Sequence, residues 1–197
     1  MTSICIVRHG ETDWNAAGRL QGTTDIHLNK TGVAQAQECG QFLSSGNWDV
    51  MITSPLQRAR KTAEIINEDL YLPFVVMEEF SERYFGDAEG MTKEDRVAAF
   101  PDKKYPNQEI EETFHRRIMN GLQKINHHYG DQKILLVAHG AVIGAILSIL
   151  SNGEIGSRKT RLINAGMSHI GFTEGRWCIR EYNQVTHLSQ YSEKGRV

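Results

Sequence analysis

The chain has 197 residues, of which 40% are hydrophobic and 23% are charged. This apolar content excludes a disordered chain, and the 18 glycines and 4 prolines exclude collagen-like and low-complexity classes. The 22 Lys and Arg residues nearly balance the 24 Asp and Glu residues, and the net charge of -2 argues against a nucleic-acid coat or a membrane-surface protein.

Apolar runs and segments of helical spacing alternate from the N-terminus onward. Residues 4–7 form a short β-branched run, which is typical of a strand buried on both faces. Apolar spacing predicts a helix over about 31–43, and a second short strand follows at 50–52. We expect the next helix to begin at Pro55 with Ser54 as its N-cap, because these residue types are favoured at those positions.

The alternation continues through the middle of the chain. A third strand is predicted at 74–77 and a fourth at 134–138, and helices are predicted at 111–129 and 141–150. Strands that alternate with helices form βαβ units. The fold class expected is therefore α/β: a three-layer sandwich whose mostly parallel central sheet carries helices on both faces.

The remaining segments fit one domain that spans residues 1–197. Residues 166–173 and 176–182 alternate in polarity around a turn, which predicts a hairpin at a sheet edge. The polar stretch at about 90–112 has no clear period, and we interpret it as a short, partly helical insert. No internal repeat or linker indicates a second domain.

The cysteine pattern and the longest apolar run both bear on the compartment. The chain has three widely spaced cysteines: Cys5, Cys39 and Cys178. Their spacing favours neither a disulfide framework nor a zinc ribbon, so a reduced, cytoplasmic setting is expected. The N-terminus shows no basic region or cleavage site of a signal peptide. The apolar run 134–150 is shorter than the ~20 residues that span a bilayer, and we expect no membrane association.

Two histidines follow strands of the predicted sheet. The first strand leads into Arg8-His9-Gly10, and the fourth leads into His139-Gly140. Ligands bind beyond the carboxyl ends of parallel strands, and glycine lets the backbone approach a ligand closely. We therefore expect Arg8, His9 and His139 to line one site. A turn histidine without a chemical role is the alternative for either histidine taken alone.

Arg58 lies in the first turn of the helix after the second strand. A cation at a helix N-terminus opposes the helix dipole, so it destabilises the helix unless an anion lies nearby. A helix start with an arginine beside it is a common way to hold phosphate. The sequence therefore predicts a phosphate pocket at this edge of the sheet.

These motifs resemble the histidine phosphatase superfamily, the phosphoglycerate-mutase-like group. Residues 8–12 match its signature, and residues 54–63 match its second phosphate-binding segment. His139 matches its second histidine, and Glu82 matches the position of its proton-transferring acid. The similarity covers almost the whole chain. By size and loop pattern, the broad-specificity phosphatases are the most similar subgroup.

The resemblance implies a role for each matching residue. His9 would attack phosphorus and become a phosphohistidine, and nearby Arg8 and Arg58 would keep its imidazole neutral. Glu82 would protonate the leaving group and then help to deprotonate water; its alternative is a surface carboxylate paired with Arg83. His139 is the third catalytic position implied, and the substrate-binding positions implied are Arg8, Asn15, Gln21, Gly22, Arg58 and His139. Neither a metal ion nor a cofactor is expected.

The expected function is hydrolysis of small phosphorylated metabolites, with inorganic phosphate as product. One alternative is a 2,3-bisphosphoglycerate-dependent phosphoglycerate mutase, and another is a weakly active module that binds phospho-ligands. True mutases carry extra basic residues in the insert after the acid, whereas the insert here is acidic in balance. No nucleic-acid partner is expected. The sequence leaves open the substrate, a homodimer, and whether His27, Glu109 or Asn164 line the pocket.

Overall fold

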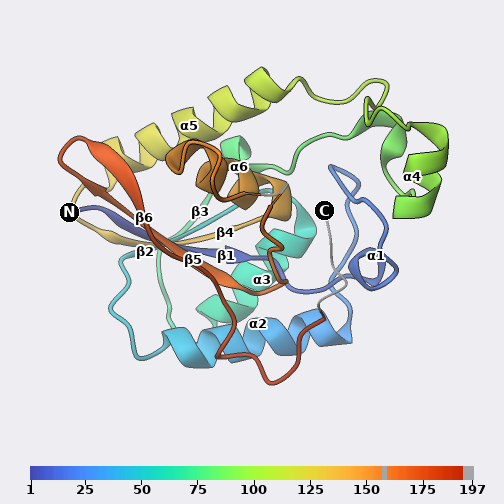
Figure 1. Cartoon of the computed structure of the whole chain (residues 1–197). Coiled ribbons are helices and arrows are strands. Elements are labelled where there is room, and N and C mark those ends of the chain that lie inside the picture. The colour runs from blue at the N-terminus through green and yellow to red at the C-terminus, as the bar shows by residue number, and fades with distance from the viewer. Residues whose placement is uncertain (157–158, 193–197) are drawn as a thin grey trace.

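One central sheet carries helices on both faces in the computed structural model, which describes residues 1–156 and 159–192 (Figure 1). Its strand order is β3-β2-β4-β1-β5-β6. The strands are β1 (Ser3–Arg8), β2 (Val50–Thr53), β3 (Phe74–Val76), β4 (Lys133–Ala138), β5 (Met167–Thr173) and β6 (Arg176–Gln184). The three-layer α/β sandwich predicted from the sequence is confirmed.

The sheet is parallel except at one edge. Strands β1, β2, β3 and β4 pair in parallel, whereas β5 runs antiparallel to β1 and β6 runs antiparallel to β5. The predicted hairpin therefore lies at the edge, as expected. In the β1–β4 pair, Arg8 is opposite Ala138. This register places the residues that follow the two strands, His9 and His139, at the same end of the sheet.

Helices cover the two faces in pairs, with α2 and α3 on one face and α5 and α6 on the other (Figure 1). The helices are α1 (Asp13–Ala16), α2 (Lys30–Leu43), α3 (Gln57–Asn67), α4 (Lys93–Ala99), α5 (Glu111–His128) and α6 (Gly140–Leu150). Two short 3₁₀ helices are η1 (Glu78–Phe80) and η2 (Gly86–Ala88). The helix α4 lies within residues 90–112. No helix in the described ranges is long and apolar enough to cross a membrane.

Alternate residues of the central strands fill two cores. In β1, Ile4 and Ile6 pack toward α5 and α6, whereas Cys5 and Val7 pack toward α2 and α3. The apolar residues at helical spacing along α5 are buried: Phe114, Ile118, Leu122 and Ile125. Burial of each such side chain contributes about 1.5–3 kcal/mol. These two cores hold the carboxyl ends of β1, β2 and β4 in a fixed arrangement.

The predicted start of the helix after β2 is wrong. The helix α3 begins at Gln57, and Ser54 does not cap it. The side chain of Asp25 accepts the Gln57 N–H at 2.9 Å instead, so a distant loop supplies the cap. Ser54 is buried, and its Oγ lies 2.7 Å from Nε2 of His139. The Asp25 carboxylate also supplies an anion at the helix N-terminus.

Candidate active site

The ends of β1 and β4 bring His9 and His139 together. Their ring centroids are 5.2 Å apart, and both side chains are buried. Parallel register explains this proximity, because each histidine directly follows a strand that ends opposite the other. The structure therefore places both histidines of the two His-Gly pairs in one site.

The hydrogen bonds of His9 assign its tautomer. Nδ1 lies 2.7 Å from the carbonyl oxygen of Gly10, so this nitrogen carries the proton and donates it. Nε2 accepts from Nε of Arg58 at 3.3 Å. Burial, followed by the charges of Arg58 and Arg8, lowers the pKa of His9 well below its usual value. His9 is thus a neutral imidazole whose Nε2 lone pair faces the cationic side of the site.

Arg58 and Arg8 are both buried in the site. The Arg58 guanidinium is held by the carbonyls of Gly22 and Thr24, which accept from Nη2 and Nη1 at 2.6 and 3.0 Å. Arg8 donates to the carbonyl of Leu162 at 2.5 Å. Burial lowers the pKa of Arg8 to about 10, so the guanidinium remains charged near neutral pH. Two fixed cations therefore lie beside His9.

Glu82 is a buried carboxyl group, so the alternative of a surface carboxylate paired with Arg83 is wrong. Its Oε1 accepts from the backbone N–H of Arg83 at 2.9 Å. Its Oε2 accepts from the N–H of Ala141, near the start of α6, at 3.1 Å. Burial raises the pKa of Glu82 above its ordinary value, against the opposing charge of Arg58. A carboxyl group in this environment is suited to hold and transfer a proton.

A network of buried amides surrounds the first turn after β1. Gln21 donates to Thr12 Oγ1 at 2.7 Å, and Asn15 donates to Gln21 Oε1 at 3.2 Å. Asn164 donates to Asn15 Oδ1 at 3.1 Å and to the backbone carbonyl of His9 at 3.0 Å. Asn15 and Gln21 are therefore linked to the backbone of His9 through Asn164. Asn164, left open by the sequence, belongs to the same network.

A carboxylate that the sequence did not single out supports the loop after α1. Glu89 accepts from the N–H groups of Thr23 and Thr24, both at 2.9 Å, and from Phe85 N–H at 3.0 Å. The loop contains Gly22, which has a φ of +57° and whose carbonyl holds Arg58. Glu89 thus shapes the site indirectly. No local pattern marks this role, because Thr23 and Thr24 lie more than 60 residues before Glu89 in the chain.

The remaining candidates have different surroundings. His27 is exposed, and Glu109 forms an ion pair with Arg117 at 2.8 Å. His139 Nδ1 has no hydrogen-bond partner among the described residues, and burial with the charge of Arg58 lowers the pKa of His139 well below its usual value. Within the described ranges, no three His, Cys, Asp or Glu side chains are arranged to hold a metal ion.

Comparison with known proteins shows which family this chain resembles. The model of the histidine phosphatase superfamily (branch 1) matches residues 4–185. The uncharacterized phosphatase PhoE of Bacillus subtilis is 51% identical over 191 residues, which cover 97% of this chain and 99% of the relative. A probable phosphoglycerate mutase, GpmB of Klebsiella pneumoniae, is 31% identical and covers 95% of each chain.

A solved structure extends the similarity to a liganded relative. It is a histidine-to-alanine mutant of phosphoserine phosphatase from Entamoeba histolytica in complex with phosphoserine. The TM-score is 0.84 at 30% sequence identity, and the match covers 95% of this chain and 100% of the other.

Proposed function

The chain belongs to the histidine phosphatase superfamily and is a phosphomonoester hydrolase, and we propose that it works through a phosphohistidine formed at Nε2 of His9. One observation carries this assignment. Nδ1 of His9 is committed to the Gly10 carbonyl, so the lone pair on Nε2 faces Arg58. A neutral, oriented imidazole beside fixed cations is what attack on a phosphate dianion requires.

The reaction then has two displacements. In the first, Nε2 of His9 attacks phosphorus, the P–O ester bond breaks, and protonated Glu82 gives its proton to the leaving oxygen. In the second, a water attacks the phosphohistidine while the Glu82 carboxylate takes a proton from it. The P–N bond breaks, inorganic phosphate leaves, and His9 and Glu82 return to their starting states.

We assign the binding of the phosphoryl oxygens to three side chains: Arg8, Arg58 and His139. Arg8 and Arg58 supply fixed positive charge beside His9. Ser54 Oγ accepts from Leu56 N–H and lies against Nε2 of His139. A serine hydroxyl that donates to Nε2 leaves the ring proton on Nδ1, which is then available to a phosphoryl oxygen. Preorganised donors of this kind supply much of the catalysis in phosphoryl transfer.

The proposed substrates are small phosphorylated metabolites, and water rather than a second metabolite is the acceptor. A mutase must neutralise a second anionic group of its bisphosphorylated intermediate. The insert carries basic residues, but its acidic residues outnumber them: Lys93, Arg96, Lys103 and Lys104 against Glu94, Asp95, Asp102, Glu109, Glu111 and Glu112. The similarity to a probable phosphoglycerate mutase makes the isomerase the second candidate.

One assay separates the two candidates. The protein is supplied with 3-phosphoglycerate and catalytic 2,3-bisphosphoglycerate, and 2-phosphoglycerate and inorganic phosphate are followed together. We expect phosphate to form faster than the isomer. We also expect the rate of phosphate release to be unchanged in the presence of a chelator. Phosphoserine and sugar phosphates, assayed in parallel, rank the substrate classes. Isomer formation much faster than phosphate release would establish the mutase instead.

A further inference from the structure

Arg117 on α5 uses all five N–H donors of its guanidinium. Two of them bind the Glu109 carboxylate, with Nε to Oε1 at 2.8 Å and Nη2 to Oε2 at 2.9 Å. The other three donate to the backbone carbonyls of Glu79, Ser81 and Glu82, at 2.9, 2.7 and 3.1 Å. A planar guanidinium fits this set of acceptors, whereas a lysine ammonium has three donors at one point.

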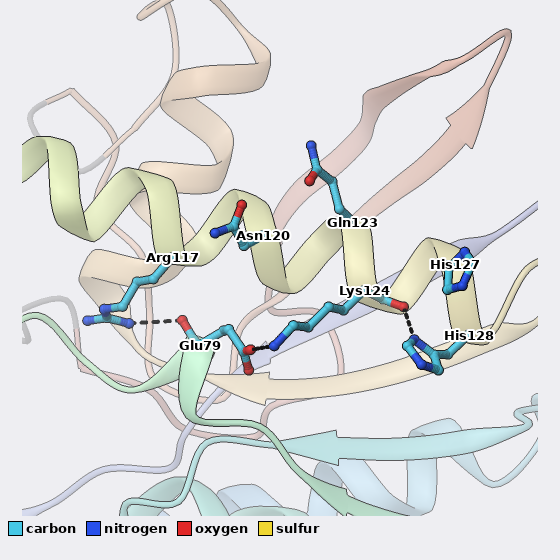
Figure 2. Close-up of a pocket in the computed structure, with 7 residues that line it drawn as sticks. All are labelled: Glu79, Arg117, Asn120, Gln123, Lys124, His127 and His128. Atoms are coloured by element: carbon cyan, nitrogen blue, oxygen red, sulfur yellow. Dashed lines mark hydrogen bonds and ion pairs between the residues drawn. The ribbon is translucent and has the colours of Figure 1, made fainter.

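The segment that Arg117 binds carries the proposed catalytic acid. After β3 ends, the chain forms the short helix η1 and then extends at Ser81 into Glu82. Figure 2 shows Arg117 and Lys124 of α5 reaching toward Glu79 of η1. Within this segment the N–H groups of Phe80 and Ser81 donate to the carbonyls of Met77 and Glu78. Arg117 adds three bonds to the carbonyls of Glu79, Ser81 and Glu82, which hold the backbone up to the acid itself.

Close packing brings η1 onto α5. Gly121 faces η1, and a Cβ added there would lie 2.8 Å from Cζ of Phe80 and 2.9 Å from Cβ of Glu79. The absence of a side chain at this position therefore lets the two helices approach. This approach brings the carbonyls within reach of Arg117, which lies one turn earlier on α5.

Glu109, the ion-pair partner of Arg117, lies near the end of the insert at 90–112. Glu109 N–H donates to the Tyr84 carbonyl at 2.8 Å, and the Glu109 carbonyl accepts from Arg83 Nη2 at 3.0 Å. The side chains of Arg117 and Glu109 are only 23% and 17% exposed, so water competes little for this ion pair. Arg117 thus joins the end of the insert to the segment of the acid.

We propose that Arg117, held by Glu109, is a positioning residue that fixes the Glu82 carboxyl for proton transfer to the leaving group. This inference rests on the proposed role of Glu82. The Glu82 carboxyl accepts from the Ala141 N–H at 3.1 Å, and Arg117 holds the backbone carbonyl of the same residue at 3.1 Å. Displacement of a catalytic group by about 1 Å costs on the order of a hundredfold in rate.

The test compares two aryl esters of similar size, phenyl phosphate and p-nitrophenyl phosphate. Phenoxide is a basic leaving group that needs a proton, whereas p-nitrophenoxide is stabilised and departs without one. The quantity measured is kcat/KM, which reports formation of the phosphoenzyme. The ratio of the two values cancels the fraction of folded enzyme in a sample.

The variants are Arg117→Ala, Arg117→Lys, Glu82→Gln, the double variant Arg117→Ala with Glu82→Gln, and the control Arg116→Ala. Arg116 neighbours Arg117 on α5 but is exposed. We expect Arg117→Ala to lower the phenyl-to-nitrophenyl ratio about tenfold, toward the ratio of Glu82→Gln. Arg117→Lys lowers it less, Arg116→Ala leaves it unchanged, and Arg117→Ala adds nothing to Glu82→Gln.

The outcomes separate the two hypotheses. An equal loss on both esters in Arg117→Ala, or a further fall of the ratio in the double variant, overturns the positioning role of Arg117. If Glu82→Gln itself leaves the ratio unchanged, the proposed acid role of Glu82 fails, and the role of Arg117 fails with it. Should Arg117→Ala not fold, the same comparison is made with Arg117→Lys.

Discussion

Nε of Arg58 lies 3.3 Å from Nε2 of His9, while the two Nη groups of the same guanidinium hold the carbonyls of Gly22 and Thr24. One side chain therefore joins the proposed nucleophile, the start of α3 and the loop after α1. When a phosphoryl group reaches Nε2, the Arg58 guanidinium is already in place beside it. No reorganisation of the cation is then needed in the transition state.

Replacing Arg58 by Ala should therefore impair catalysis strongly. We expect kcat/KM to fall about a hundredfold, which corresponds to about 3 kcal/mol, because a charge that stabilises the transition state is lost. Competitive inhibition by vanadate should weaken as well. The control is Arg60→Ala on the same helix, whose exposed side chain pairs with Glu64. Unchanged kinetics and vanadate affinity in Arg58→Ala would refute its place in the phosphate pocket.

Replacing His9 by Ala should abolish the covalent intermediate. Acid quench with labelled substrate should trap a phosphoenzyme in the parent and none in His9→Ala, because no nucleophile then faces the substrate. The far-UV spectrum should stay unchanged, since β1 and its pairing do not depend on this side chain. The exposed His127 provides the control, as His127→Ala. Activity of His9→Ala within tenfold of the parent would contradict the assignment.

Gly22 and Gly18 form a matched pair for the loop after α1. Both have positive φ, but a Cβ at Gly22 would overlap the Glu89 carboxylate, whereas a Cβ at Gly18 meets nothing within 4 Å. Gly18→Ala should cost about 1–2 kcal/mol of stability from backbone strain and retain full activity. Gly22→Ala should lower the stability more than Gly18→Ala does. It should also lower kcat/KM, because the Gly22 carbonyl holds Arg58. Urea unfolding and kinetics of both variants check this, and equal kinetics would exclude a role for the Gly22 loop.

The buried histidines make stability depend on pH. The folded-state pKa values of His9 and His139 lie well below the ordinary value of 6.5. Below that pH the unfolded chain therefore binds more protons than the folded protein does. The free energy of unfolding consequently falls as the pH decreases through 6.5. Each histidine contributes a slope of up to about 1.4 kcal/mol per pH unit. The raised pKa of Glu82 acts oppositely, since its contribution falls as the pH rises above 4.5.

Urea titrations between pH 7.5 and 5.5 measure this slope. In His9→Gln the slope should be shallower than in the parent by up to about 1.4 kcal/mol per pH unit, because one titrating group is gone. The contribution of Glu82 is common to both proteins and largely cancels. Identical slopes would show that His9 is not held neutral by its surroundings.

Much of this arrangement follows from the sequence by itself. The β-branched runs of β1 and β4 are buried on both faces, which predicts a parallel sheet. In such a sheet, strand ends meet at one edge, so the two His-Gly pairs had to converge. The apolar spacing of α5 predicted its buried face for the same local reason. Motif resemblance added Glu82 as the expected acid.

Other features were decided only by the tertiary structure. Asp25 caps α3 in place of Ser54, Asn164 joins the amide network from a loop before β5, and Arg117 holds three carbonyls and Glu109. Apolar residues repeat with the period of their element, and the sequence therefore shows which face they bury. Polar side chains that satisfy distant backbone groups follow no period. Their partners are set by where the loops lie after the sheet and helices have packed.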